Sequence, residues 1–426
     1  MKAIRLGSML GLALLSAAPA VLGNHPAQAQ QQSPSLQQIQ SQAQATAELR
    51  GVWLTANDMP VLRDRPRMQQ AVAELAQLNF NTLYIVVWND GMAYYPSAVV
   101  QQRGIQDFEV RGLQGQDVLA ELVREARQRG LLVIPWFEFG FMVPPDSDLA
   151  RRHPDWLTRK RDGGLTSISA AGEVAWLNPF RPEVQQLITD LVLEVLRTYP
   201  VDGIQFDDHM SLPRAFGYDP FTAALYRKET GKAPPANEAD PAWIRWRADK
   251  ITAFMTRLKQ AMDQTRPGSL LSVSPNYYDH AYKLQLQDWL RWVRLGIADE
   301  VLIQIYRDDL DSFVPHLNRP EVQESRAKLP VAMAVMAGQR SKPAAIEVVS
   351  QQVEAARASG LGIGLFYLES LWSLDPTSAD SRKATLASLF AAPAPRRQVA
   401  AISPTAPEPE LEPEPAPPLL APPPPL

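Results

Sequence analysis

Between residues 48 and 392, short apolar segments alternate with longer amphipathic ones. The short segments are β-branched, aromatic and nearly continuous in apolar residues, which is typical of strands buried on both faces. The predicted strands cover residues 51–57, 82–89, 131–140, 202–209, 270–276, 300–308, 329–338 and 362–372. The predicted helices cover residues 66–78, 117–129, 182–198, 241–265, 284–296, 312–328, 343–359 and 378–390.

A strand followed by a helix, repeated eight times, predicts a closed (β/α)8 TIM barrel of the α/β class. The alternative is an open doubly wound sheet, which needs a glycine-rich phosphate loop after its first strand. Here that position holds Ala56-Asn57-Asp58-Met59-Pro60, so we favour the barrel. Two connections, 91–116 and 141–181, leave the carboxyl ends of strands and are too long for plain turns. We expect both of them to lie over the mouth of the active site.

The two ends of the chain have a different composition. Residues 1–29 have the charged start, apolar run and small-residue cleavage pattern of a signal peptide. Their apolar run is interrupted and shorter than the roughly 20 residues of a membrane span, so we expect no span after cleavage. The composition of residues 30–47 predicts a disordered linker. The Pro/Glu-rich composition of residues 393–426 predicts an extended tail, which is either solvated or in contact with cell wall or another protein. The folded domain is then 48–392, in an exported protein that is periplasmic or secreted.

Composition excludes several classes of function. With no cysteine, the chain has no disulfide, thiolate metal site or cysteine nucleophile. The net charge of −4 gives no indication of nucleic-acid binding. The five histidines lack the spacing of metal-binding motifs, so we expect neither metal nor cofactor. A Gly-x-Ser-x-Gly elbow is also absent, which argues against a serine hydrolase.

Acidic residues stand at the ends of three predicted strands. The fourth strand ends in Asp207-Asp208-His209, and side-chain alternation directs Asp207 inward, with Asp208 and His209 in support. Glu138 ends the third strand and Glu369 the eighth, each among aromatic residues that would raise its pKa, as a general acid requires. Which glutamate is the partner of Asp207 stays open. Any one of these acids could instead be a solvated group or a helix cap.

Other strand ends carry neutral hydrogen-bonding groups and flat aromatic rings. Sugars present many hydroxyls and apolar ring faces, so this lining predicts a polysaccharide substrate. The tryptophans could instead pack in the core. The predicted substrate-binding residues are His209, Trp53, Asn57, Trp88, Asn89, Trp136, Asn276, Gln304, Tyr306 and Trp372.

Several motifs resemble those of the glycosyl-hydrolase-like 10 family, a bacterial group of exported TIM-barrel glycosidases. They are Glu48-Leu49-Arg50-Gly51-Val52-Trp53-Leu54-Thr55, His153-Pro154-Asp155-Trp156-Leu157, Leu177-Asn178-Pro179, Val201-Asp202-Gly203-Ile204-Gln205-Phe206-Asp207-Asp208-His209 and Gln304-Ile305-Tyr306. The resemblance implies action on glycans, since some members cleave peptidoglycan glycan strands, including strands stripped of peptides. Two features depart from the family pattern. His209 replaces a commoner aromatic residue, and Trp136-Phe137-Glu138-Phe139 replaces a segment that usually contains Asn.

The leading hypothesis is glycoside hydrolysis by a pair of carboxyl groups. Asp207 would be nucleophile or general base, and Glu138 or Glu369 the general acid. The alternatives are a glycan-binding barrel without catalysis and a transglycosylase.

Overall fold

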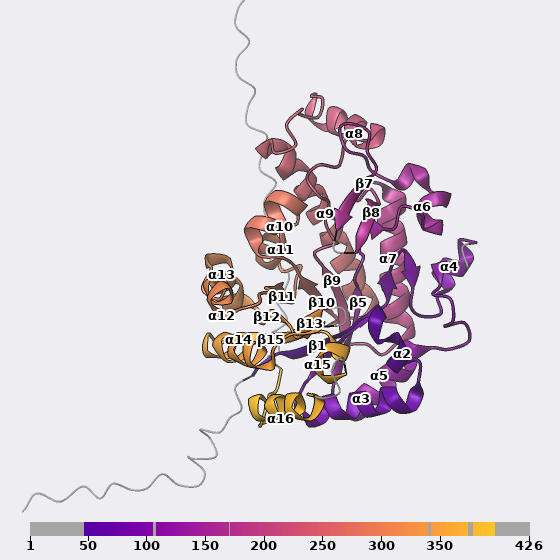
Figure 1. Cartoon of the computed structure of the whole chain (residues 1–426). Coiled ribbons are helices and arrows are strands. Elements are labelled where there is room, and N and C mark those ends of the chain that lie inside the picture. The colour runs from indigo at the N-terminus through magenta and orange to yellow at the C-terminus, as the bar shows by residue number, and fades with distance from the viewer. Residues whose placement is uncertain (1–46, 105–107, 170, 340–341, 374–377, 397–426) are drawn as a thin grey trace, which may run out of the picture. The chain divides into compact units, whose positions relative to one another are not determined.

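The computed structural model describes residues 47–104, 108–169, 171–339, 342–373 and 378–396. The predicted signal peptide, nearly all of the predicted linker and residues 397–426 of the predicted tail lie outside these ranges. Within them, eight parallel strands form a closed barrel, in the order β1-β15-β12-β11-β10-β9-β5-β2 (Figure 1). The predicted TIM barrel is therefore confirmed.

Each barrel strand lies within a predicted apolar segment or within one residue of it. Nearly all residues of these strands are buried, because side chains on one face fill the barrel and those on the other pack under helices. The strands are β1 (Arg50–Leu54), β2 (Thr82–Val86), β5 (Leu132–Phe137), β9 (Gly203–Asp207), β10 (Leu270–Ser274), β11 (Glu300–Gln304), β12 (Val331–Met336) and β15 (Gly362–Phe366).

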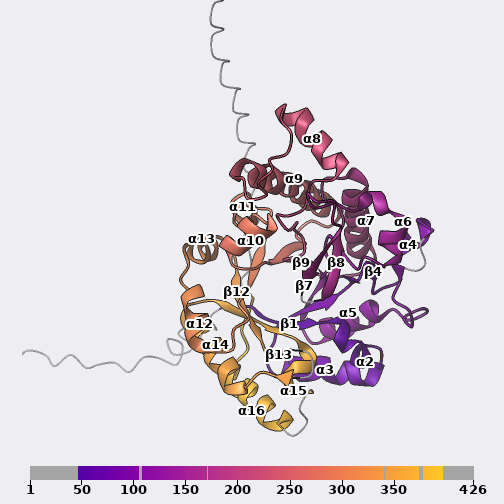
Figure 2. The same cartoon turned by 45° about the horizontal axis from the view of Figure 1, so that its top comes forward.

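Helices surround the strands when the molecule is turned toward the barrel mouth (Figure 2). Those that follow successive strands are α3 (Arg65–Gln77), α5 (Val118–Gln128), α7 (Pro182–Thr198), α9 (Pro241–Thr265), α11 (Trp289–Arg294), α13 (Pro320–Lys328), α14 (Ile346–Ala358) and α16 (Ala379–Leu389). Among the described residues, none of the helices combines the length and the apolar character needed to cross a membrane.

Three predicted elements are divided or are continued by a different element in the structure. The helix expected at 284–296 is two helices, α10 (Tyr278–Gln285) and α11, because Leu286 has a left-handed φ of 55° and Asp288 caps α11. The helix expected at 312–328 is interrupted before Pro320, which starts α13. The strand expected at 362–372 ends at Phe366, and the chain continues as α15 (Leu368–Trp372).

The long connections contain structure of their own. The one after β2 holds β3 (Trp88–Asn89), β4 (Met92–Ala93) and α4 (Ala98–Gln102). The one after β5 holds β6 (Met142–Val143), α6 (Asp148–Arg152), β7 (Thr166–Ser169) and β8 (Gly172–Trp176), with β6, β8 and β7 in one antiparallel sheet. Both connections leave the carboxyl ends of their strands.

Large aromatic rings fill the interior of the barrel. Trp53 on β1 stacks on Tyr84 of β2 with ring centroids 5.2 Å apart, and its Nε1 donates to Oε1 of Gln205 at 2.7 Å. Gly364 on β15 makes room for this indole, because a Cβ at that position would lie 2.6 Å from the Trp53 ring. The interior below the mouth is therefore packed rather than open.

The described chain continues four residues past the predicted domain boundary at 392 and packs on the amino-terminal end of the barrel. The carbonyl oxygens of Ala394 and Pro395 accept hydrogen bonds from Asn81 Nδ2 (3.1 Å) and Glu48 N (2.9 Å). Arg396 then forms an ion pair with Glu300, whose side chain is 1% exposed and also accepts from Tyr84 Oη. Residues 393–396, assigned above to the tail, thus belong to the folded unit.

Replacing Arg396 by alanine leaves the buried carboxylate of Glu300 without its cationic partner. We expect the free energy of unfolding, measured in urea, to fall by about 3–5 kcal/mol. Arg294→Ala, which breaks an exposed ion pair with Glu324, serves as control and should cost less than about 1 kcal/mol. Equal losses for the two variants would mean that Arg396 does not anchor the base of the barrel.

Candidate active site

A cavity of about 590 Å³ opens at the carboxyl ends of the barrel strands. Its walls include Met142 and Ala171 of the connection 141–181, as predicted, whereas the segment after β2 contributes Asn89 and Asp90, which precede the predicted connection 91–116. The predicted site residues that line it are Trp53, Asn57, Asn89, Trp136, Glu138, Asp207, Asp208, His209, Gln304 and Tyr306.

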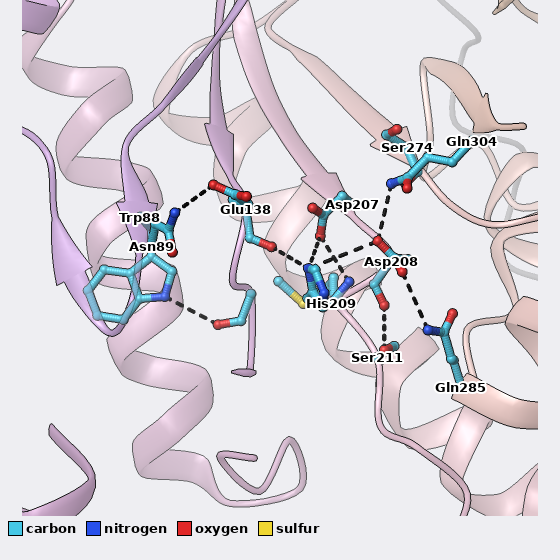
Figure 3. A network of polar contacts seen from close by, with 12 residues as sticks. Trp88, Asn89, Glu138, Asp207, Asp208, His209, Ser211, Ser274, Gln285 and Gln304 are labelled. Carbon is cyan, nitrogen blue, oxygen red and sulfur yellow. Dashed lines mark hydrogen bonds and ion pairs between the residues drawn. The ribbon is translucent and has the colours of Figure 1, made fainter. Parts of the chain in front are cut away.

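Glu138 and Asp207 lie side by side because of the register between β5 and β9. Trp136 pairs with Gln205 and Phe137 with Phe206, so the next positions hold Glu138, directly after β5, and Asp207, the last residue of β9. The rings of Phe137 and Phe206 pack together at 5.4 Å on the outer face. Alternation then turns the two acids into the cavity, where both are drawn in Figure 3.

His209 binds the catalytic candidate Asp207 and the neighbouring strand together. Its Nδ1 lies 2.8 Å from the carbonyl oxygen of Glu138 and 3.1 Å from Asp207 Oδ1, and its backbone N–H donates to the same Oδ1 at 2.9 Å (Figure 3). Gly140 permits this approach, since a Cβ there would lie 2.6 Å from the carbonyl oxygen of His209. Both contacts use Oδ1 of Asp207, which leaves Oδ2 for chemistry in the cavity.

The two carboxyl groups have different proton affinities. Burial raises the pKa of Glu138 to about 8, and the nearby charge of Asp207 contributes. Burial also raises the pKa of Asp207, but His209 opposes the shift, and the result is about 6. Burial alone would lower the pKa of His209, yet the two aspartates raise it to about 10. At neutral pH, Glu138 is therefore protonated, Asp207 mostly ionised and His209 an imidazolium.

Glu138 is oriented by the connection after β2. Nδ2 of Asn89 donates to Oε2 of Glu138 at 2.7 Å. An N–H donor at Oε2 directs the carboxyl proton to Oε1. The acid can then present this proton to a bound substrate.

Asp208 also lines the cavity, but amide groups occupy its oxygens. Oδ1 accepts from Gln304 Nε2 at 3.1 Å, and Oδ2 accepts from Asn276 Nδ2 at 2.9 Å and Gln285 Nε2 at 3.4 Å. Asp208 thus holds the strand ends together beside Asp207.

Over the described ranges, one group of acids and histidine could hold a metal ion: Asp207, Asp208 and His209, with one ligand atom each within 4.8 Å of the others. The imidazole nitrogen that faces both aspartates is Nδ1, and it needs its proton to donate to the carbonyl oxygen of Glu138. Because that nitrogen has no free lone pair and the oxygens of Asp208 are occupied, the donor set fits a metal poorly. The arrangement suits carboxylate chemistry instead.

Four predicted site residues lie away from the cavity. Trp88 is fully buried, and Trp372 packs in α15 under Lys383, so both are core residues. Asn276 does not line the cavity and contacts the site through its hydrogen bond to Asp208. Glu369 lies in α15 rather than at a strand end; its N–H donates to Asp58 Oδ1 at 2.8 Å, and its Oε2 accepts from Tyr367 Oη at 3.3 Å.

Other residues line the cavity although the sequence did not single them out. Ser274, level with Asp207 on the next strand, and Asp90, next to Asn89, could have been found by strand position. The remainder belong to loops and to the aromatic floor, where local sequence carries no such signal. The full set is Thr55, Ala56, Asp90, Phe139, Met142, Ala171, Ser274, Met336, Gln339, Phe366 and Tyr367.

Three buried polar atoms of the lining have no hydrogen-bond partner among the described residues. They are Oδ1 of Asn89, Nε1 of Trp136 and Oγ of Ser274. A buried polar atom left unpaired costs about 1–3 kcal/mol. These three unpaired atoms are buried within the wall of the cavity.

Two curated relatives are similar to this chain in sequence. The glycosyl hydrolase DigH of Escherichia coli K12 is 28% identical over 303 residues, which are 62% of this chain and 66% of DigH. The glycosyl hydrolase YngK of Bacillus subtilis is 23% identical over 305 residues, which are 62% of this chain and 55% of YngK. The match thus spans less than two thirds of the length of either relative.

Solved structures share the fold at low sequence identity. The glycoside hydrolase domain of PgaB (BpsB) from Bordetella bronchiseptica has a TM-score of 0.61 at 16% identity and covers 80% of this chain and 99% of that domain. The α-L-fucosidase isoenzyme 2 of Paenibacillus thiaminolyticus has a TM-score of 0.57 at 17% identity, over 81% of this chain and 49% of that one.

The sequence model of one family matches most of the barrel. Its description is "Glycosyl hydrolase-like 10", and the match runs over residues 48–354, from the start of the barrel into α14. This range contains Glu138, Asp207 and His209. The chain belongs to the glycosyl hydrolase-like 10 family.

Proposed function

We propose that this protein is an exported glycoside hydrolase that cleaves a bacterial glycan, namely the glycan strands of peptidoglycan. The observation that carries the proposal is the carboxyl pair Glu138 and Asp207, held in one cavity with opposite protonation at neutral pH. Family membership and relatives named glycosyl hydrolases support the reaction type. The choice of glycan rests on the family resemblance, and export rests on the pattern of residues 1–29.

The geometry favours a double-displacement mechanism. Glu138 donates its proton to the glycosidic oxygen while Oδ2 of Asp207 attacks the anomeric carbon, which releases the leaving sugar and forms a glycosyl ester. Water then attacks that carbon and gives a proton to Glu138, and the ester bond to Asp207 breaks. His209 keeps Asp207 ionised before attack and as it leaves.

Aromatic side chains form the floor on which a sugar ring would rest. The ring of Phe366 lies 5.4 Å from Tyr306, 6.2 Å from Trp53 and 6.4 Å from Trp136. Flat rings beside hydrogen-bonding groups suit the alternating apolar faces and hydroxyls of a saccharide.

Asp207→Asn should lower kcat on peptide-free peptidoglycan strands by about 10³-fold or more, because the amide cannot attack. Glu138→Gln should lower it by about 10²-fold or more. The matched control is Glu369→Gln, a glutamate outside the cavity, which should stay within about twofold of the unmodified enzyme. Products are quantified by mass spectrometry, and circular dichroism checks folding.

If the glycan binds but no products form, and if binding is the same in the Asp207→Asn variant, the protein is a glycan-binding protein instead. Lengthened chains among the products would identify a transglycosylase. A loss of activity in Glu369→Gln with Glu138→Gln unimpaired would reverse the assignment of the acid.

The pH dependence of kcat/KM should be bell-shaped. Activity needs Asp207 ionised, so it rises as the pH passes about 6, and it needs Glu138 protonated, so it falls as the pH passes about 8. His209, with a pKa near 10, keeps its charge throughout this window. Rates that continue to rise well beyond pH 8 would contradict the role of Glu138.

The product should keep the anomeric configuration of the substrate. Neighbouring strands lie about 4.8 Å apart, so groups in register across β5 and β9 fall near the roughly 5–5.5 Å of retaining enzymes. An inverting enzyme needs about 6.5–9.5 Å, which leaves room for a water. Proton NMR of the first-formed product distinguishes the two outcomes, and an inverted anomer would exclude Asp207 as nucleophile.

A further inference from the structure

A second cavity, of about 620 Å³, lies on the outer rim of the barrel mouth and shares no lining residue with the cavity of the carboxyl pair. Its walls come from the start of α9, the end of α10 and the segment that follows β9. The backbone N–H of Arg214 in that segment donates to the carbonyl oxygen of Leu284 at 2.8 Å, which joins the segment to α10. This rim cavity is therefore a site of its own.

The floor of the rim cavity is apolar. Ile244 is 7% exposed, and the ring of Tyr282 stacks on that of Tyr278 with centroids 5.7 Å apart. The remaining apolar residues of the lining are Ala239, Pro241 and Ala242. An apolar surface of this kind, in a recess at the edge of the mouth, suits an apolar side chain of a ligand.

The edge of the rim cavity is cationic. Its lining includes Arg214, Arg245 and Lys283 but no acid. Acids outside the lining pair with two of these cations, at 3.2 Å for Arg214 with Glu238 and at 2.9 Å for Lys283 with Asp279. Arg245 has no ion pair with any residue in the described part of the chain. A ligand that matches the rim cavity therefore has an apolar side chain flanked by anions.

One segment of this chain has the matching sequence. Residues 398–426 contain four glutamates but no lysine and no arginine. The glutamates occupy every second position from Glu408 to Glu414, and the residues between them are prolines except at Leu411. Leu411 is thus an apolar side chain between two acids.

The length of the chain beyond Arg396 is sufficient to reach the rim cavity. Burial raises the pKa of Asp202, and the charges of Arg396 and Arg266 both oppose this shift, so both arginines lie near this carboxylate. Arg266 caps the carboxyl end of α9, whose 25 residues span about 37 Å from there to the rim cavity. Leu411 is 15 residues after Arg396, and an extended polyproline segment of that length spans about 46 Å.

We propose that the acidic segment Glu408–Glu414 docks in the rim cavity of its own chain. Leu411 packs on the apolar floor, and Glu410 and Glu412 pair with the cationic edge. In a polyproline helix of three residues per turn, these glutamates point to either side of Leu411, as the arrangement of floor and edge requires.

Docking of this segment acts on the active site through α10. Lys283, at the edge of the rim cavity, is two residues before Gln285, whose Nε2 donates to Asp208 Oδ2 at 3.4 Å. A segment held on α10 therefore restrains the support of Asp208 without entering the cavity of the carboxyl pair.

A glutamate-specific protease measures the docking. Such proteases cleave after glutamate unless proline follows, and within residues 398–426 this leaves the bond between Glu410 and Leu411. The rate of cleavage of this bond in the native full chain is measured by mass spectrometry. It is compared with the rate in a synthetic peptide of residues 404–418 that carries the same substitutions.

Cleavage of the unmodified chain should be about tenfold slower than cleavage of the peptide. Arg245→Glu combined with Lys283→Glu should abolish this protection because the edge then repels the acids, and Leu411→Ser should abolish it by removing the apolar contact. Glu412→Lys should restore part of the protection in the charge-reversed chain. The control Arg124→Glu, an exposed arginine on α5, should leave it unchanged.

Cleavage of the unmodified chain at the rate of the peptide would overturn the proposal, and so would protection that survives the charge reversal. Protection that is lost with Arg124→Glu would instead place the segment on α5. Protection that increases with protein concentration would assign the rim cavity to the tail of a second copy. Circular dichroism checks the folding of the charge-reversed chain, and Leu411→Ser tests the same contact from a position beyond the described residues.

Discussion

The register between β5 and β9 is the constraint on which the site depends. Hydrogen bonding pairs Trp136 with Gln205 and Phe137 with Phe206, and this pairing sets Glu138 beside Asp207 at the barrel mouth. A slip of one residue would turn one of the acids outward, because successive side chains point to opposite faces. The bond from His209 to the carbonyl oxygen of Glu138 and the close approach at Gly140 strengthen the same junction.

Surroundings, rather than residue type, divide the roles of the carboxyl groups. Glu138 and Asp207 share a cavity and both lose solvation there, but of these two side chains the imidazolium of His209 contacts that of Asp207. Asp208 is equally close in sequence, yet three side-chain amides occupy its oxygens and give it a structural role. One cationic neighbour therefore gives the two carboxyl groups different pKa values, which the proposed roles of general acid and nucleophile require.

Much of the fold could be predicted because its signals are local. Continuous apolar segments identified all eight barrel strands, since a strand buried on both faces cannot alternate with polar residues. The break between α10 and α11 was not predicted, because the left-handed residue at this turn is Leu286 and not the glycine that would indicate a helix end. The placement of Arg396 was missed for a different reason: its partner Glu300 is 96 residues away in sequence.

By itself, the sequence determined the barrel, the inward direction of Asp207 and the family, because strand burial, side-chain alternation and motifs are properties of short segments. Only the tertiary structure shows that Glu138 lines the cavity beside Asp207 and that Glu369 does not. Glu369 lies in α15, whose start is stabilised by a hydrogen bond from the backbone N–H of Tyr367 to Ser370. The N–H of Glu369 donates to Asp58, which lies 311 residues away in sequence. The different positions of Glu138 and Glu369 depend on which strands are neighbours and on where β15 ends. Contacts between segments that are far apart in sequence determine both.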